Sequence, residues 1–199
     1  MEISFRMAGR GDCAIILDFI RALAVYEKRA DQVTATVREL EEWLFDKQVA
    51  EVLLASVSGG CNADGIKSGD NAGDVDAENE CNDAGGINTK LKCNDAGEKY
   101  VEFAGFALFF PHYSTFLGLP GLYLEDIFVH EKFRGRGVGT AMMRELARIA
   151  VGRGYGRFEW SCLDWNAPSI EFYLKLGAEP LDEWTTYRLA GDALRKLAQ

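Results

Sequence analysis

The stretch "EKFRGRGVGTAMMRELARIA", residues 131–150, places three glycines directly before a segment with helical spacing of apolar residues. Glycine loses more conformational entropy on folding than other residues, so its repeated use before a helix-patterned segment needs a reason. The first N–H groups of a helix lack partners within the helix and carry the positive end of its dipole. Glycines at that place let an anion approach those groups closely, so the stretch predicts an anion-binding turn. The glycines are Gly135, Gly137 and Gly139, and Arg134 and Arg136 add positive charge.

Two nucleotide-binding motifs do not fit this stretch. The Walker motif requires Gly-Lys-Ser/Thr, whereas the chain reads Val138-Gly139-Thr140 and lacks the lysine. The Rossmann fingerprint requires a glycine where Thr140 stands and an acidic residue about 20 positions later. On the glycines alone, a plain strand-to-helix connection remains an alternative.

On both sides of this stretch, alternating and helical patterns predict a mixed α/β domain with a mostly antiparallel central sheet flanked by helices. Asp12 and Asn166 are candidate N-caps, and Thr36 with Glu39 makes a candidate capping box. The predicted strands are 3–8, 51–57, 99–113, 121–130, 157–163 and 183–190. The predicted helices are 13–29, a segment after Thr36, 138–152, 166–177 and a polar tail after 190.

One segment departs from this pattern. Residues 58–98 hold nine acidic side chains and three lysines and loosely repeat "CNADG". The segment has too few apolar residues to bury, so we expect a disordered acidic insertion within a single domain, 1–199. An EF-hand calcium loop is the sharper alternative, but its glycine and final glutamate are out of register.

Composition excludes several function classes. The formal net charge of the 199-residue chain is -9, which does not support a basic nucleic-acid-binding face. No apolar run reaches the ~20 residues of a membrane span, and no signal-peptide block opens the sequence, so we expect a cytoplasmic protein away from membranes. The cysteines and histidines lack metal-ligand spacing, and we expect no metal.

The glycine stretch resembles a known motif. Residues 134–139, "RGRGVG", match Arg/Gln-x-x-Gly-x-Gly/Ala, the pyrophosphate-binding motif of the GNAT superfamily of N-acetyltransferases. "LEDIFVHEKFRGRGVG", "DWNAPSIEFYLKLGA" and "DCAIILDFIRALAVYEK" are similar to the spermidine/spermine and thialysine acetyltransferase branch, and "HYSTFLGLPGLYLED" resembles its plant-like members. The resemblance covers the chain except about 58–98. It implies a GNAT fold, acetyl-CoA as co-substrate, direct attack by the amine and a homodimer.

The resemblance also implies roles for individual residues. Glu125 takes the position of the general base and Tyr173 that of the general acid, while Glu27 and Asp126 take acidic substrate-binding positions. From the residues alone, Glu125 could be a surface carboxylate and Tyr173 a core aromatic. Glu125 and Asp126 must point to opposite faces unless a bulge intervenes. The implied cofactor-binding residues are Phe128, Val129, Arg134, Gly135, Arg136, Gly137, Val138, Gly139, Thr140, Asn166 and Ser169.

The implied reaction moves an acetyl group to a primary amine of a small polycationic substrate. Diamines, polyamines and ornithine- or thialysine-like amino acids all remain open, because "HYSTFLGLPG" replaces the Asp-Pro-Trp-like stretch of polyamine enzymes. His112 could touch the substrate or simply end a strand. A protein or peptide N-acetyltransferase and a non-catalytic acyl-CoA-binding regulator are the alternatives.

Overall fold

The computed structural model describes residues 1–60, 90–91 and 99–199. They form two compact units, Met1–Ser161 and Cys162–Gln199. A single domain over 1–199 remains a prediction. Most of the expected insertion lies outside the described residues; its described parts are the end of one strand and a two-residue strand.

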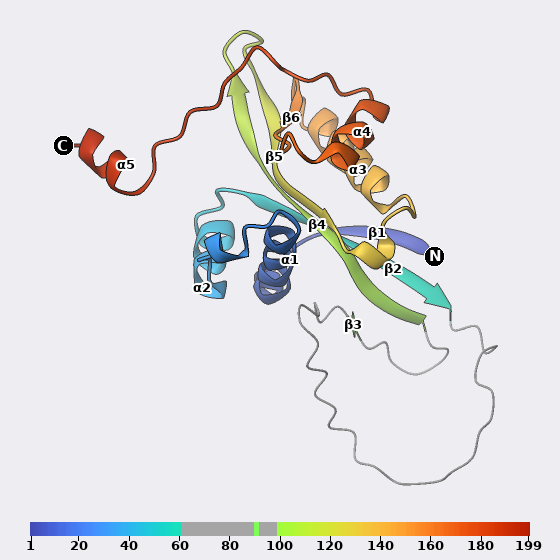
Figure 1. The fold of residues 1–199 in the computed structure, drawn as a ribbon. Coiled ribbons are helices and arrows are strands. Elements are labelled where there is room, and N and C mark those ends of the chain that lie inside the picture. The colour runs from blue at the N-terminus through green and yellow to red at the C-terminus, as the bar shows by residue number, and fades with distance from the viewer. Residues whose placement is uncertain (61–89, 92–98) are drawn as a thin grey trace, which may run out of the picture. The chain divides into compact units, whose positions relative to one another are not determined.

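The first unit is built on a mixed sheet with the strand order β1-β2-β4-β5-β6, and β3 also pairs with β4 (Figure 1). Every pair is antiparallel except β5 with β6, which is parallel. The expected mixed, mostly antiparallel sheet is therefore confirmed. The strands are β1 Glu2–Met7, β2 Glu51–Gly60, β3 Lys90–Leu91, β4 Lys99–Ser114, β5 Leu119–Val129 and β6 Phe158–Trp160.

Three α-helices belong to this unit, and the patterns predicted each of them. Thr36 and Glu39 form the expected capping box: Thr36 Oγ1 accepts from the Glu39 N–H at 3.2 Å, and Glu39 Oε2 accepts from the Thr36 N–H at 2.9 Å. The helices are α1 Cys13–Tyr26, α2 Val37–Leu40 and α3 Val138–Gly152. The 3₁₀ turns are η1 Arg10–Asp12, η2 Ala30–Gln32 and η4 Glu131–Phe133, and a π-helical turn, η3, spans Glu41–Asp46.

The expected side-chain cap of α1 is wrong. Asp12 occupies the N-cap position, but its side chain makes no capping hydrogen bond to α1. Its carboxylate instead accepts from the Gly9 N–H at 2.7 Å and forms a two-point ion pair with Arg6. Two nearby donors therefore compete successfully for the oxygens that a cap would use.

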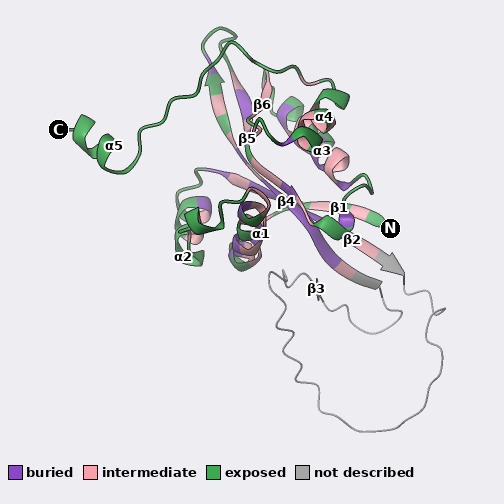
Figure 2. Ribbon diagram, viewed as in Figure 1, coloured by how far each residue is buried: buried purple, intermediate pink, exposed green. Residues whose placement is uncertain are grey.

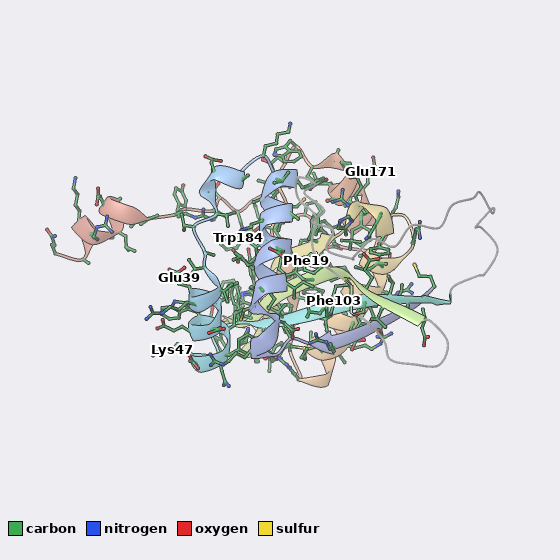
Figure 3. The ribbon with its side chains drawn as sticks, turned by 90° about the horizontal axis from the view of Figure 1, so that it is seen from below. Phe19, Glu39, Lys47, Phe103, Glu171 and Trp184 are labelled. Carbon is green, nitrogen blue, oxygen red and sulfur yellow. The ribbon has the colours of Figure 1, made fainter. Side chains whose placement is uncertain are left out.

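Helices α1 and α2 cover one face of the sheet and α3 the other (Figure 1). On the α1 face, the Phe19 ring stacks on Phe106 with centroids 5.5 Å apart and lies 6.2 Å from Phe128. Phe19 and Phe103, both labelled in Figure 3, belong to this core. The buried positions follow β2, β4 and the inner side of α1 (Figure 2). Each large side chain buried there contributes roughly 1.5–3 kcal/mol.

The second unit contains α4, Ala167–Lys175, and α5, Gly191–Leu197. Asn166 caps α4 as expected, since its Oδ1 accepts from the Ser169 N–H at 3.4 Å. Gly177, at φ +87°, follows the end of the helix in the left-handed conformation that favours glycine. The predicted strand 183–190 is wrong: these residues pair with no strand of the described chain. Alternating pattern alone does not make a strand, because a strand needs a neighbour to receive its hydrogen bonds.

Gly105→Ala should destabilise the first unit. Gly105 lies opposite Val129, and an added Cβ would overlap the Phe128 carbonyl oxygen and lie 3.3 Å from Met142 Sδ. Because backbone cannot yield cheaply, we expect a loss of about 1–3 kcal/mol in the free energy of unfolding, measured by urea denaturation. Gly11→Ala is the control, since a Cβ there meets nothing within 4 Å. Equal losses in both variants would contradict this account.

Candidate active site

A β-bulge at Glu125 sets the geometry of the candidate site. Along β5 and β4, Phe128 pairs with Phe106 and Asp126 with Leu108, but the next residue paired is Leu124, with Phe109. Glu125 is therefore one extra residue in β5. The bulge changes the side-chain alternation, so the simple expectation that Glu125 and Asp126 point to opposite faces does not apply to this pair.

Strands β5 and β6 part at the same position. β6 pairs with β5 only at Leu122, Tyr123 and Leu124. From Glu125 to Val129, no strand of the described chain pairs with β5 on the side away from β4. This edge leaves backbone groups able to accept an extended ligand as an added strand.

The turn before α3 has the geometry of an anion site. Gly135 and Gly137 adopt φ values of +70° and +82°, which side chains rarely tolerate, and a Cβ at either would meet nothing within 4 Å. No side chain of residues 1–60, 90–91 or 99–199 caps the helix. Among the described residues, the backbone N–H groups of residues 135–140 have no hydrogen-bond partner. The next one, that of Ala141, donates to the Gly137 carbonyl at 2.9 Å. The N–H groups before it remain available to an anion.

The basic side chains beside this turn have different environments. Arg134 Nε donates to the Val129 carbonyl at 2.9 Å, and its guanidinium lies 4.7 Å from the Tyr26 ring centroid and 5.3 Å from that of Phe128. Lys132 is paired with Glu102. In the described part of the chain, Arg136 has no such partner and is exposed, so it is the cation available to an anion at the turn.

Three carboxylates interact on the α1 side of the bulge. Burial, together with the smaller effects of the negative charges of Glu125 and Glu27, raises the pKa of Asp126 to about 6. Glu27 is the C-cap of α1, where the chain turns through Lys28 at φ +60°. The Arg29 and Lys28 N–H groups bond back to the helix in a Schellman arrangement, which holds Glu27 in place.

The other expected site residues lie in the second unit. Tyr173 is on α4, with its ring centroid 5.2 Å from that of Phe172. Asn166 is buried and caps α4, and Ser169 supplies the N–H that Asn166 accepts. Each residue therefore has a definite local position in the helix.

Residue-by-residue reasoning missed a cluster on the sheet. His112 of β4, Arg157 before β6 and Glu159 of β6 lie within hydrogen-bond distance of one another. The signal for it was available: Arg157, Glu159 and Ser161 alternate with Phe158 and Trp160, which places polar side chains on one face.

The described residues contain no group of three or more histidine, cysteine, aspartate or glutamate side chains arranged to hold a metal ion. None of the helices they form has the length and apolar character needed to cross a bilayer.

Comparison with known proteins defines the family. Residues 73–178 match the acetyltransferase (GNAT) family. A thialysine N-epsilon-acetyltransferase of Sus scrofa is 31% identical over 206 residues, covering 99% of this chain and 98% of that protein. An L-ornithine N5-acetyltransferase of Arabidopsis thaliana is 47% identical over 94 residues, covering 47% of this chain and 41% of that protein. A solved integron cassette protein of V. cholerae has the same fold, with a TM-score of 0.66, 20% identity and coverage of 100% and 99%.

The chain therefore belongs to the GNAT family of acetyltransferases and is an N-acetyltransferase. Acetyl-CoA is the acetyl donor of this family. The resemblance drawn from the glycine motif is confirmed, and so is the expected fold.

Asp126→Asn should change how stability depends on pH. The folded chain holds the Asp126 proton more tightly than the unfolded chain, because its folded pKa is raised from 3.8 to about 6. The ionised form of Asp126 therefore destabilises the folded state. This loss of stability is absent at low pH and grows as the pH rises through the folded pKa. From about pH 5 to about pH 7.5, the variant should gain about 1 kcal/mol over the parent in urea denaturation.

The control for this measurement is Asp31→Asn, at an exposed aspartate of η2. A gain of the same size in the control, or none in Asp126→Asn, would contradict the account.

Proposed function

We propose that this N-acetyltransferase moves the acetyl group of acetyl-CoA to a primary amine of a small polycationic substrate by direct attack. One observation carries the proposal: a helix entrance with available N–H groups follows the strand whose bulge presents Glu125. The first feature suits the diphosphate of coenzyme A, and the second places a carboxylate where β5 and β6 part.

Glu125 acts as the general base in this proposal. A primary alkylamine has a pKa near ~10, so at neutral pH only about one molecule in a thousand carries a free electron pair. Glu125 takes the proton, directly or through water, as the nitrogen attacks the thioester carbonyl carbon and the carbon–sulfur bond breaks. The exposed position of Glu125 on the bulge supports this role.

The cofactor arm lies along the open edge of β5 at Phe128 and Val129, and the diphosphate lies at the turn from Gly135 to Thr140. The open edge and the positive-φ glycines support this placement. Arg136 adds the nearby charge. Arg134 serves the site indirectly, because its guanidinium holds the Val129 carbonyl and covers Tyr26 and Phe128.

Tyr173 supplies a proton to the departing thiolate, since a phenol with a pKa near ~10 matches a thiol in acidity. Asn166 and Ser169 contact the cofactor arm. These three assignments rest on the family resemblance and on their positions in α4. The cap that Asn166 makes gives the start of this helix a defined geometry.

In a diamine or polyamine substrate, Glu27 and Asp126 receive the distal ammonium. Their electrostatic coupling to each other supports the assignment, because a cation between two carboxylates relieves their repulsion. The named activities of the relatives, on ornithine and thialysine, also support a substrate with two amines.

We further propose a cytoplasmic homodimer. Residues 183–190 have a strand-like alternation but no strand partner in the described chain, which is expected of a segment that pairs across a subunit interface. A monomeric mass by light scattering at micromolar concentration would contradict the dimer.

The direct test of the proposed function is release of coenzyme A from acetyl-CoA with a panel of amines. The panel contains diamines, polyamines, diamino acids and a lysine peptide. We expect turnover with a small amine and none with the peptide. Acetylation of the peptide alone would favour a protein acetyltransferase, and calorimetric binding of acetyl-CoA without turnover would favour a regulator. Absence of acetyl-CoA binding would reject the proposal outright.

Glu125→Gln should lower kcat/KM for the preferred amine by about a hundredfold to ten-thousandfold at neutral pH, because the variant cannot accept the proton. Raising the pH should recover part of the loss as more amine becomes neutral. Calorimetric affinity for coenzyme A should stay within about twofold. Glu171→Gln, at an exposed glutamate of α4, is the matched control. Unchanged kcat/KM in Glu125→Gln would remove Glu125 from the mechanism.

A further inference from the structure

A second set of charged side chains lies on the α1 face of the sheet, toward the start of β5. We call His112, Arg157 and Glu159 the charged cluster. Glu159 Oε2 lies 2.8 Å from His112 Nε2 and 2.9 Å from Arg157 Nε, and the two nitrogens are 3.3 Å apart. The cluster joins the two strands that flank β5, so it bridges over that strand.

Gly121 of β5 makes room for the charged cluster. It pairs with His112, and a Cβ at this position would lie 2.8 Å from both His112 Nε2 and Arg157 Cγ. Any larger residue would displace the two side chains. The absence of a side chain at Gly121 is therefore part of how the cluster is built.

The cluster keeps binding groups available. Arg157 uses Nε for Glu159, and no hydrogen bond or ion pair of the described residues engages its two terminal nitrogens. Among the described residues, Glu159 likewise makes its contacts through Oε2 alone. The Arg157 and Glu159 side chains are 34% and 28% exposed, so a solute can reach them. Burial and the charge of Arg157 lower the pKa of His112, so the imidazole is neutral at neutral pH.

Strand register connects the cluster to the carboxylates near the bulge. Glu159 pairs with Tyr123 in the parallel ladder, and Tyr123 pairs with Phe110 across β4. Tyr123 and Asp126 share one face, because their partners Phe110 and Leu108 are two residues apart on β4. The path from the bulge to the cluster therefore runs over the Tyr123 ring.

Contacts with neighbouring side chains fix the Tyr123 ring in place along this path. Its centroid lies 5.3 Å from that of Phe110 and 5.5 Å from that of His112, and its hydroxyl lies 2.9 Å from Ser161 Oγ. Two residues of strand separate Tyr123 from Glu125, roughly 7 Å at ~3.3 Å per residue. A three- or four-carbon chain spans a distance of that order.

We infer that the charged cluster binds the α-amino acid end of the substrate, with Arg157 receiving the carboxylate and Glu159 the α-ammonium. This inference rests on the proposed function and narrows its substrate class to diamino acids. The alkyl chain lies over Tyr123, and the terminal amine reaches Glu125. A planar guanidinium with two free nitrogens matches a carboxylate, and a carboxylate oxygen matches an ammonium. A plain diamine has no carboxylate for Arg157, so the cluster selects against it.

The test compares ornithine with putrescine, which resembles it in chain length but lacks the carboxylate. Arg157→Gln should lower kcat/KM for ornithine at least tenfold, mainly through KM, and leave putrescine within about threefold. Arg157→Lys should restore part of the ornithine activity because it keeps the positive charge. Glu159→Gln should also weaken ornithine, through the α-ammonium. An unchanged ornithine-to-putrescine ratio in Arg157→Gln and Glu159→Gln would overturn the inference.

Two controls distinguish an effect on substrate binding from an effect on folding. Arg153→Gln breaks another arginine–glutamate pair, with Glu51 at 2.5 Å and 2.7 Å, and should leave the substrate ratio unchanged. Thermal unfolding checks that each variant folds. Failure of the parent enzyme to acetylate either amine would reject the proposed function. Calorimetry would then decide the inference: parent enzyme that binds ornithine no better than putrescine, or equal ornithine affinity in Arg157→Gln, would overturn it.

Discussion

The structure depends on one change in strand pairing: the extra residue that β5 carries at Glu125. The bulge places Glu125 where β6 leaves β5 and returns Asp126 to the face that bears Tyr123 and Phe128. In a regular strand, Glu125 and Asp126 would point to opposite faces of the sheet, and side chains would alternate between the two faces along the whole of β5. The open edge of β5 and the acidic group therefore meet at one position of one strand.

Opposite charges lie at the two ends of the segment that runs from the bulge in β5 to the start of α3. Carboxylates gather at the bulge, while the helix entrance beyond β5 presents N–H groups and the unpaired Arg136 within the described chain. Such a gradient suits a reaction in which a cationic amine meets an anionic donor, as proposed for this member of the GNAT family. The arrangement has an energetic cost, because Asp126 is partly buried beside two like charges.

Local signals predicted much of the fold. The capping pair Thr36 and Glu39, the Asn166 cap and the glycines before α3 all act within a few residues, so their geometry follows from sequence. The segment 183–190 had an equally clear alternation of apolar and polar residues but did not form a strand in the described chain. A strand needs a neighbouring strand for its hydrogen bonds, and the alternation does not show whether one is present. The Asp12 cap failed for a similar reason: Arg6 and Gly9 took its oxygens.

Residue patterns were enough to assign the family, to locate the helix that begins after the glycine turn and to name the residue types available for acetyl transfer. The folded chain was needed to show where the bulge falls, that Arg134 holds the Val129 carbonyl, and that His112 meets Arg157 and Glu159. The two groups of features differ in how far apart their contacting residues lie in the sequence. Caps and glycine turns depend on neighbours along the chain, whereas a bulge or a bridging cluster depends on the register between strands far apart in sequence.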